Sequence, residues 1–289
     1  MEIEVKGHSG CHIEIIKEKN KIYLEKSTFD SKYVKRLYNQ AIKQEKASEK
    51  EYQYIRIPEI YKIEKDENKM IMKMEYVYSK NFIDHFENAG FEQINYFIKA
   101  FDLFIKREVE SSEMMILPFN IVLDKWTDVK KKIQSNKFLS ENIEINSLIN
   151  KANIVINQNQ ENICIPVGIC HGDLTFSNIL FNGNNYYLID FLDSFIESPI
   201  MDMVKIRQDT AYMWSPLMYT GSYDKTRLNI ICNKIDSELD RCFKKYKWYC
   251  KYYHLFQLLN FLRILQYAHE EKIITFLKHK ITELICQTH

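Results

Sequence analysis

The chain has 289 residues, of which 46% are hydrophobic and 27% charged, and its formal net charge is +1. This length and apolar content suffice to bury a sizeable core, as one bilobal unit or two closely coupled domains. The near-zero charge gives no support for a nucleic-acid-binding surface, and no apolar run approaches the roughly 20 residues that span a bilayer.

The first part of the chain alternates apolar runs with polar turns, which predicts a β-rich region with one helix. Strands are expected over residues 1–6, 11–17, 21–27, 57–61 and 70–77. The turn Gly7-His8-Ser9-Gly10 separates the first two of these strands. From Ser31 to about Lys50 the chain lacks Gly and Pro, and apolar residues recur at helical intervals, so a helix is predicted there.

The rest of the chain is predicted to be mainly helical, over residues 91–152 and again towards the carboxyl end. Alternating apolar residues from Ile163 to Ile169 instead predict a strand. The seven cysteines form no Cys-x-x-Cys pair, so we expect buried thiols in a reducing compartment. Residues 1–6 have neither a basic start nor an apolar core; no secretory signal is expected, and a cytoplasmic location is predicted.

The most informative segment is His171-Gly172-Asp173-Leu174-Thr175-Phe176-Ser177-Asn178, followed at a short distance by Leu188-Ile189-Asp190-Phe191. Two apolar runs flank the turn cluster Asn182-Gly183-Asn184-Asn185, which predicts a β-hairpin that brings Asn178 and Asp190 together. Phosphoryl transfer from a nucleotide needs a carboxylate that receives a hydroxyl proton and oxygen ligands for magnesium. Asp173 fits the first role, and Asn178 with Asp190 fits the second.

These segments resemble the catalytic and metal-binding loops of the aminoglycoside phosphotransferase and choline kinase group. The resemblance implies a bilobal, protein-kinase-like α+β fold, with a small antiparallel β-sheet lobe and a larger, mainly helical lobe. It implies that Asp173 is the catalytic base, that Asn178 and Asp190 bind the metal, and that His171 and Asp202 support the loop. The expected boundary lies between a nucleotide-binding lobe of residues 1–77 and a lobe of residues 78–289 with the catalytic and acceptor sites.

The same resemblance assigns nucleotide contacts to the first lobe. The turn around Ser9 would cover the phosphates with backbone N–H groups. Lys26 is the candidate phosphate-contacting lysine, although Lys17 and Lys21 are nearby. Glu45 is the candidate carboxylate that orients Lys26, with Glu49 and Glu51 as alternatives. Backbone groups at the link between the lobes would hold the adenine; these belong to Glu75, Tyr76 and Val77.

The acceptor is less well defined by the sequence. From residue 200 onward 14 Lys and Arg stand against 9 Asp and Glu, which argues against a polycationic aminoglycoside. An amino alcohol such as choline would need an aromatic cage, which could be supplied by Tyr212, Trp214, Tyr219, Trp248, Tyr249 and Tyr253. A sugar or related polyol would be held by polar side chains near the active centre, for which the candidates are Asp193, Arg207, Gln208 and Asp209. An internal ion pair is an equal alternative for Arg207.

We therefore expect an enzyme that uses ATP and Mg²⁺ to phosphorylate a hydroxyl group of a small molecule, with a sugar ahead of an amino alcohol. No nucleic-acid or membrane partner is expected. A nucleotide-binding regulatory protein that has lost transfer activity remains an alternative, as does an aminoglycoside phosphotransferase. A protein-serine/threonine kinase is less well supported, because no Ala-Pro-Glu segment follows Asp190.

Overall fold

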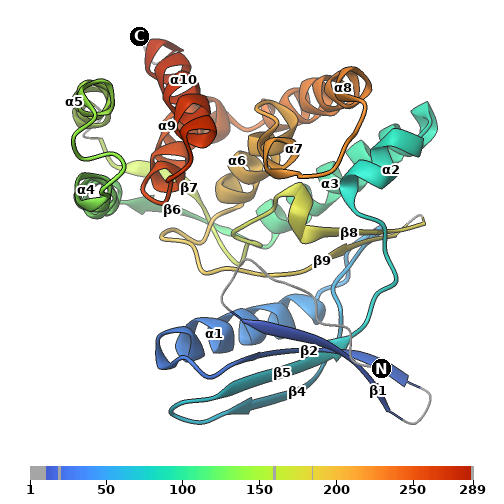
Figure 1. Ribbon diagram of the computed structural model, residues 1–289. Helices are drawn as coiled ribbons and strands as arrows, with labels where there is room; N and C mark the ends of the chain where they lie inside the picture. The colour runs from blue at the N-terminus through green and yellow to red at the C-terminus, as the bar shows by residue number, and fades with distance from the viewer. Residues whose placement is uncertain (1–10, 19–20, 159–160, 184, 288–289) are drawn as a thin grey trace.

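The chain forms two lobes, a smaller one built on a four-stranded sheet and a larger, mostly helical one (Figure 1). This computed structural model describes residues 11–18, 21–158, 161–183 and 185–287. The predicted α+β architecture, with an antiparallel sheet before a mainly helical region, is confirmed. The expected strand over residues 1–6 and the turn over residues 7–10 lie outside the described residues.

The small lobe consists of an antiparallel sheet with the strand order β1-β2-β5-β4 and one long helix against it. Its elements are β1 (His12–Glu18), β2 (Lys21–Thr28), α1 (Ser31–Ser48), β4 (Ile60–Lys65) and β5 (Met70–Glu75). Alternate side chains of a strand point to the same face, and in β5 these are methionines. Met70, Met72 and Met74 pack against one apolar face of α1, and this contact forms a core separate from that of the large lobe.

The predicted strand over residues 57–61 is displaced, because β4 begins only at Ile60 and a separate short strand, β3 (Ile55–Arg56), lies before residue 57. β3 pairs in parallel with β9 (Asn185–Leu188) of the large lobe, whereas β4 belongs to the small sheet. Pro58 lies between β3 and β4 and has no N–H to donate to a sheet. Ile55 is buried in the core of the large lobe, so the chain enters that lobe before it returns to the small sheet.

The large lobe begins with α2, after the irregular link that follows β5. Its elements up to the catalytic segment are α2 (Phe82–Asn88), α3 (Phe91–Glu110), β6 (Glu113–Leu117), α4 (Asn120–Ser135), α5 (Ile143–Gln158) and β7 (Ile163–Val167). The later elements are η1 (Phe176–Asn178), β8 (Ile179–Asn182), β9, α6 (Pro199–Thr210), α7 (Trp214–Met218), α8 (Lys225–Phe243), α9 (Lys247–Leu265) and α10 (Glu271–Gln287).

β6 interrupts the region that the sequence pattern predicts to be helical throughout. It pairs with β7 in an antiparallel two-stranded sheet, so that Met115 faces Ile165 across the pair. The apolar run of β6 ends just before Pro118, which is the local sign of a strand that the helical interpretation passed over. The β6–β7 pair anchors the strand from which the catalytic segment emerges.

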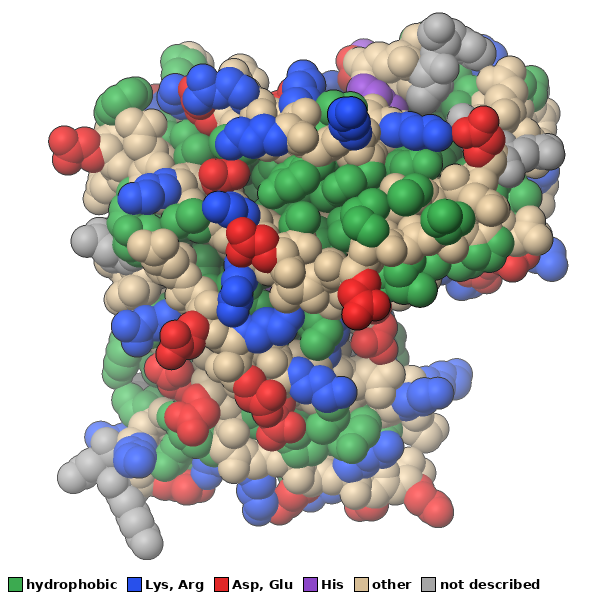
Figure 2. Space-filling view, turned by 180° about the vertical axis from the view of Figure 1, so that it is seen from behind, with side chains coloured by type: hydrophobic (Ala, Val, Ile, Leu, Met, Phe, Trp, Pro, Cys, Tyr) green, Lys and Arg blue, Asp and Glu red, His purple; other side chains and the backbone are tan. Residues whose placement is uncertain are grey.

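Helix α9 lies in the middle of the large lobe and is buried on most of its circumference. It packs against α6 on one side and α10 on the other, as Figure 1 shows. In the part of the chain that the structure describes, no helix is both long and apolar enough to cross a membrane. Figure 2, which shows the molecule from behind, shows a notch in the outline between the two lobes and hydrophobic side chains grouped on the large lobe.

Candidate active site

The catalytic segment leaves the carboxyl end of β7 and places Asp173 where two polar side chains meet it. The Lys205 ammonium, from α6, lies 3.1 Å from Oδ1 of Asp173. The Asn178 amide donates to Oδ2 at 3.1 Å and to the backbone oxygen of Asp173 at 2.8 Å. Burial raises the pKa of Asp173, but the opposite charge and hydrogen bond of Lys205 outweigh it, so the pKa lies below its ordinary value. The carboxylate is thus held ionised, with about a quarter of its side chain, 27%, exposed.

Gly172 makes the tight turn before Asp173 possible. Its φ is +86°, and an added Cβ would lie 2.0 Å from the carbonyl oxygen of Leu192. Both the left-handed backbone and the close approach require glycine. His171 beside it is fully buried, and burial lowers its pKa to about 4, so the ring is neutral near pH 7. Its Nδ1 accepts from the Asp173 amide at 3.2 Å, while Nε2 bonds the Ile189 carbonyl at 2.8 Å.

Asp202 lies behind the catalytic segment at the start of α6. Its carboxylate accepts hydrogen bonds from the backbone N–H groups of His171, at 2.5 Å, and Gly172, at 2.7 Å. Glu108 of α3 faces it as a second buried carboxyl group. Burial raises the pKa of Asp202 to about 6, and burial together with the charge of Asp202 raises that of Glu108 well above its usual range. The geometry of Asp202 is that of a brace for the loop.

The hairpin predicted between the two metal-ligand candidates is present. β8 and β9 pair with Ile179 opposite Leu188, and the Ile189 N–H donates to the Asn178 carbonyl at 3.1 Å. Asp190 follows with a left-handed φ of +62°, which turns the chain sharply after the strand. Both residues offer hard oxygen donors, the type of ligand that magnesium takes from proteins. The donor set is of the type that fits magnesium, which the amide oxygen of Asn178 and the carboxylate of Asp190 would hold.

Lys26 reaches from β2 in the small lobe to this carboxylate. Its ammonium is almost completely buried and lies 2.7 Å from Oδ1 of Asp190. The structure does not bring Glu45 to Lys26, which corrects the predicted pair. Glu45 is the single acidic residue of α1 and lies on the exposed face of that helix, while Gln44 next to it points inward and donates to the Pro58 carbonyl at 3.1 Å. Successive side chains of an α-helix are rotated by about 100°, so Gln44 can face the core while Glu45 faces solvent.

Three of the other nucleotide-contact candidates lie at the end of β5 and in the link that follows it. Glu75 ends β5, where its N–H donates to the Glu59 carbonyl at 2.8 Å. Tyr76 and the buried Val77 form the irregular link towards α2. Ser9 lies outside the described residues.

Two of the candidate acceptor contacts are used inside the large lobe instead. Arg207 donates to Asp236 through two nitrogens, each at 2.8 Å, and to Asp240 at 2.6 Å. Asp209 is fully buried and accepts hydrogen bonds from the N–H groups of Phe176 and Ser215, both at 2.6 Å. Because these groups are saturated by internal partners, we reassign Arg207 to the internal ion pair and Asp209 to bracing η1 and α7.

The remaining acceptor candidates occupy different surroundings. Gln208 is buried and accepts from Lys205 at 3.3 Å, so it supports the lysine that contacts Asp173. Asp193 accepts from Asn39 of α1 at 2.8 Å and therefore contacts the small lobe. Trp214, at the start of α7, packs against Phe276 of α10, with ring centroids 5.9 Å apart. The contacts described for Gln208, Asp193 and Trp214 are therefore with residues other than Asp173.

Two of the aromatic residues considered for a choline cage, Tyr249 and Tyr253, already contact a cation. The Arg207 guanidinium lies 4.5 Å from the ring centroid of Tyr253 and donates to the Tyr249 hydroxyl at 2.7 Å. A cation–π site that an internal arginine fills is closed to a quaternary ammonium ligand. This part of the large lobe therefore gives no support to the amino-alcohol alternative.

Two cations near Asp173 were absent from the predicted site, namely Lys205 and Arg263. Lys205 stood in a polar cluster of the sequence, but its contact with Asp173 depends on how α6 packs beneath the loop. Arg263 lies within the apolar pattern of α9 and carries no motif of its own. A cation among apolar residues of a buried helix is the one signal in the sequence that could have indicated it.

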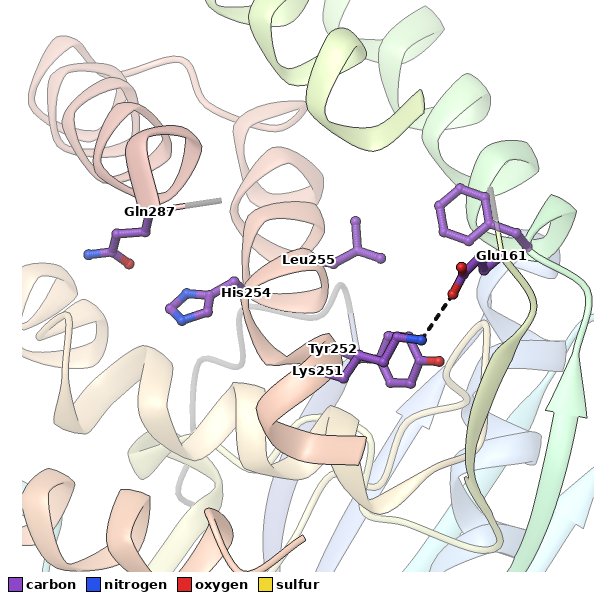
Figure 3. Close-up of a pocket in the computed structure, with 7 residues that line it drawn as sticks. Glu161, Lys251, Tyr252, His254, Leu255 and Gln287 are labelled. Carbon is purple, nitrogen blue, oxygen red and sulfur yellow. Dashed lines mark hydrogen bonds and ion pairs between the residues drawn. The ribbon is translucent and has the colours of Figure 1, made fainter. Parts of the chain in front are cut away.

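A cavity of about 200 Å³ lies elsewhere in the large lobe and is drawn in Figure 3. Its lining includes Lys251 and Glu161, which form an ion pair of 3.1 Å, and Tyr252, whose hydroxyl accepts from the Cys164 N–H at 3.2 Å. Cys164 is at the amino end of β7, whereas the catalytic segment follows the carboxyl end. The cavity is therefore separate from the site around Asp173.

Comparison with known proteins supports the assignment of this segment. The model of the phosphotransferase enzyme family, APH, matches residues 158–225, which include Asp173, Asn178 and Asp190. The segment around Asp173 is thus similar to that of the phosphotransferase enzyme family. The resemblance to the aminoglycoside phosphotransferase and choline kinase group is thereby confirmed. No curated protein shows significant sequence similarity to the chain.

Solved structures of phosphotransferases share the fold over nearly the whole chain. Aminoglycoside phosphotransferase APH(2'')-Ib with bound ADP has a TM-score of 0.59 at 15% identity, covering 100% of this chain and 93% of that one. A glucosamine kinase complex with glucosamine, ADP and inorganic phosphate has a TM-score of 0.60 at 10% identity, covering 98% and 76%. Spectinomycin phosphotransferase APH(9)-Ia has a TM-score of 0.50 at 12% identity, covering 99% and 92%. Identities this low show the protein-kinase-like fold and leave the acceptor open.

Proposed function

We propose that this protein transfers the γ-phosphoryl group of ATP to a hydroxyl of a small metabolite, with a sugar or related polyol favoured as the acceptor. The observation that carries the proposal is the convergence of Asp173, Asn178 and Asp190 with Lys26 from the opposite lobe. Nucleotide binding is assigned to residues 1–77 and the acceptor site to residues 78–289. The ADP-bound phosphotransferases of similar fold support the choice of nucleotide.

The proposed mechanism is in-line displacement by the acceptor hydroxyl. Asp173 accepts a hydrogen bond from that hydroxyl and takes its proton as the acceptor oxygen bonds to the γ-phosphorus and the bond to the ADP oxygen breaks. Lys26 holds the nucleotide phosphates through its positive charge. Asn178 and Asp190 would hold magnesium, which when bound neutralises charge on those phosphates. Asn178 also orients Asp173 through its hydrogen bond of 3.1 Å.

Two observations order the acceptor classes. The ion pair that Asp173 forms in the described structure is with the cation Lys205, which disfavours a polycationic aminoglycoside. Two of the tyrosines considered for choline, Tyr249 and Tyr253, contact Arg207. A hydroxylated acceptor without a positive charge remains as the class that fits both observations. A regulatory protein that binds nucleotide without transferring phosphate is the second candidate, since Asp190 and Lys26 form an ion pair with each other.

The test is ADP release by purified protein with ATP and magnesium, across sugars, polyols, amino alcohols and aminoglycosides. We expect acceptor-dependent turnover with a sugar or polyol, and loss of about 10²–10⁴-fold in Asp173→Asn with nucleotide affinity retained. Asp190→Ala should instead weaken magnesium-dependent nucleotide binding. Tight nucleotide binding without turnover on any acceptor would favour the regulatory alternative, and undiminished turnover in Asp173→Asn would overturn the catalytic assignment.

A further inference from the structure

Arg263 belongs to the face of α9 that supports the catalytic residues. It lies one helical turn after Asn260, whose amide donates to Oε1 of Gln208 at 2.7 Å. Gln208 in turn accepts from Lys205 at 3.3 Å, and Lys205 contacts Asp173 at 3.1 Å. A short chain of contacts therefore ties this face of α9 to the catalytic carboxylate.

The guanidinium of Arg263 also approaches the segment that follows Asp190. It lies 5.7 Å from the ring centroid of Phe195, which stands between Asp190 and α6. Burial lowers the pKa of Arg263, and Asp173 is the carboxylate whose charge opposes that effect. Arg263 thus lies on the face of α9 that hydrogen bonds link to Lys205, the ion-pair partner of Asp173.

No carboxylate of the described residues forms an ion pair with Arg263, and no hydrogen bond of its guanidinium is found among them. Asp173 itself is paired with Lys205 instead. A half-buried guanidinium has lost part of its hydration, and only an anionic or strongly polar partner recovers that free energy. Elsewhere in this protein the buried Arg207 has such partners in Asp236 and Asp240.

A second cation lies on α4, the helix that packs against α9. The Lys125 side chain of α4 is 25% exposed, and its pKa is lowered first by burial and next by the charge of Arg263. The carboxylate closest to Lys125 is Asp128, at 3.7 Å, which also pairs with Lys132 at 2.8 Å. In the described part of the chain, the positive charges of Arg263 and Lys125 are therefore not balanced by carboxylates of their own. An excess of positive charge of this kind favours the binding of an anion.

We propose that Arg263 binds an anionic group of the acceptor, a carboxylate or a phosphate, while Asp173 receives the proton of the hydroxyl that is phosphorylated. The inference rests on the proposed kinase function and narrows its acceptor to a hydroxylated acid or a sugar phosphate. A guanidinium presents paired N–H groups that match either anion. The nucleotide phosphates are assigned to Lys26 in the opposite lobe, so Arg263 is available to the acceptor.

The experiment compares acceptors that differ in one group. Glucose is paired with glucuronate and with glucose 6-phosphate, and glycerol with glycerate, while kanamycin serves as a cationic probe. ADP release is measured for the wild type, Arg263→Met, Arg263→Lys and the matched control Arg241→Met, which removes an exposed arginine of α8. The KM for ATP is measured in every variant.

We expect the anionic member of a pair to have at least a tenfold higher kcat/KM in the wild type. Arg263→Met should remove that preference with the KM for ATP unchanged, Arg263→Lys should keep part of it, and Arg241→Met should keep all of it. Preference for a neutral or cationic acceptor, equal losses for both members of a pair, or a raised KM for ATP would each overturn the inference and leave the kinase function standing.

Absence of turnover with every acceptor would count against the kinase function itself. The inference is then decided by calorimetric titration with glucuronate and glucose. Binding of glucuronate that Arg263→Met abolishes supports an anion site, and equal affinity of the two sugars for the wild type contradicts it.

Discussion

The ammonium of Lys205 lies 3.1 Å from Oδ1 of Asp173 and comes from α6, which the β8–β9 hairpin separates from the segment that carries Asp173. The segment from His171 to Asn178 contains no Lys or Arg of its own, so α6 supplies the positive charge. Gln208, one turn along the same helix, holds the lysine in place. The orientation of the catalytic carboxylate therefore depends on the packing of α6.

Replacing Lys205 by Met should lower kcat by about 10- to 100-fold, because a misplaced catalytic group loses roughly that factor. The KM for ATP should stay the same, since Lys205 contacts no residue assigned to the nucleotide. Steady-state kinetics with ATP and the best acceptor provide the measurement. Lys205→Arg is the control that keeps the charge and should retain part of the activity. A kcat equal to that of the wild type would remove Lys205 from the site.

Arg207→Met should destabilise the protein without changing its kinetic constants. The variant leaves Asp236 partly buried without its cation, while Asp240 keeps only Lys244, and breaking a buried pair costs about 3–5 kcal/mol. Urea denaturation measures the free energy of unfolding, and kinetics are measured at a temperature where the variant is folded. A stable variant with a raised KM for the acceptor would restore the alternative that Arg207 contacts the substrate.

Gly172→Ala should be more damaging than Gly183→Ala, although both glycines have positive φ. A left-handed residue with a Cβ costs about 1–2 kcal/mol at either position. At Gly172 the Cβ would also meet the Leu192 carbonyl at 2.0 Å, whereas nothing lies within 4 Å of it at Gly183. We expect lower stability and loss of turnover in the first variant and a modest loss of stability alone in the second. Thermal unfolding and ADP release distinguish them, and equal effects would contradict the close approach.

The buried Glu108–Asp202 pair predicts a particular dependence of stability on pH. Both carboxyl groups have raised pKa values in the fold, so the folded protein binds protons more tightly than the unfolded chain. The pair's contribution to the free energy of unfolding should therefore fall as the pH rises from about 4 through 6, by at most about 1.4 kcal/mol per pH unit for each proton. The charge of Lys43 and the buried thiol of Cys170 also interact electrostatically with the pair, and both residues are kept in the variant used for the test.

Glu108→Gln is the variant that tests this dependence. The amide can donate to Asp202 at any pH, so the variant should gain stability relative to the wild type between pH 5 and pH 8. Urea denaturation at pH 5, 6.5 and 8 gives the comparison. A constant difference across that range would show that no proton is bound by the pair in the fold.

The parts of the structure that depend on neighbouring residues could be predicted from the sequence. Alternating apolar residues and a turn cluster are local signals, and the hairpin between Asn178 and Asp190 formed as predicted. The α1 helix likewise begins at Ser31, where Asp30 caps it by accepting from the Lys32 N–H at 2.9 Å.

The parts that escaped prediction depend on how distant elements pack. The ion pair of Lys26 with Asp190 joins residues of opposite lobes. The sequence around Lys26 does not indicate whether its partner is Asp190 or Glu45. Whether Arg207 meets substrate or an internal carboxylate is decided by the rotation of α6 against α8. Tertiary packing likewise decides that β3 and β4, within residues 55–65, belong to different sheets. Pro58 between them is the local sequence signal of this break.

The excursion of β3 into the large lobe has a consequence for protein engineering. The chain crosses between the lobes after α1, returns at β4, and crosses again after β5, and Ala47 and Ile55 are buried in the large-lobe core. A chimaera made by exchanging residues 1–77 with a relative would therefore import a foreign edge strand beside Tyr186. A graft that keeps residues 47–57 with the recipient's large lobe should fold, because each hydrophobic core then retains its own sequence.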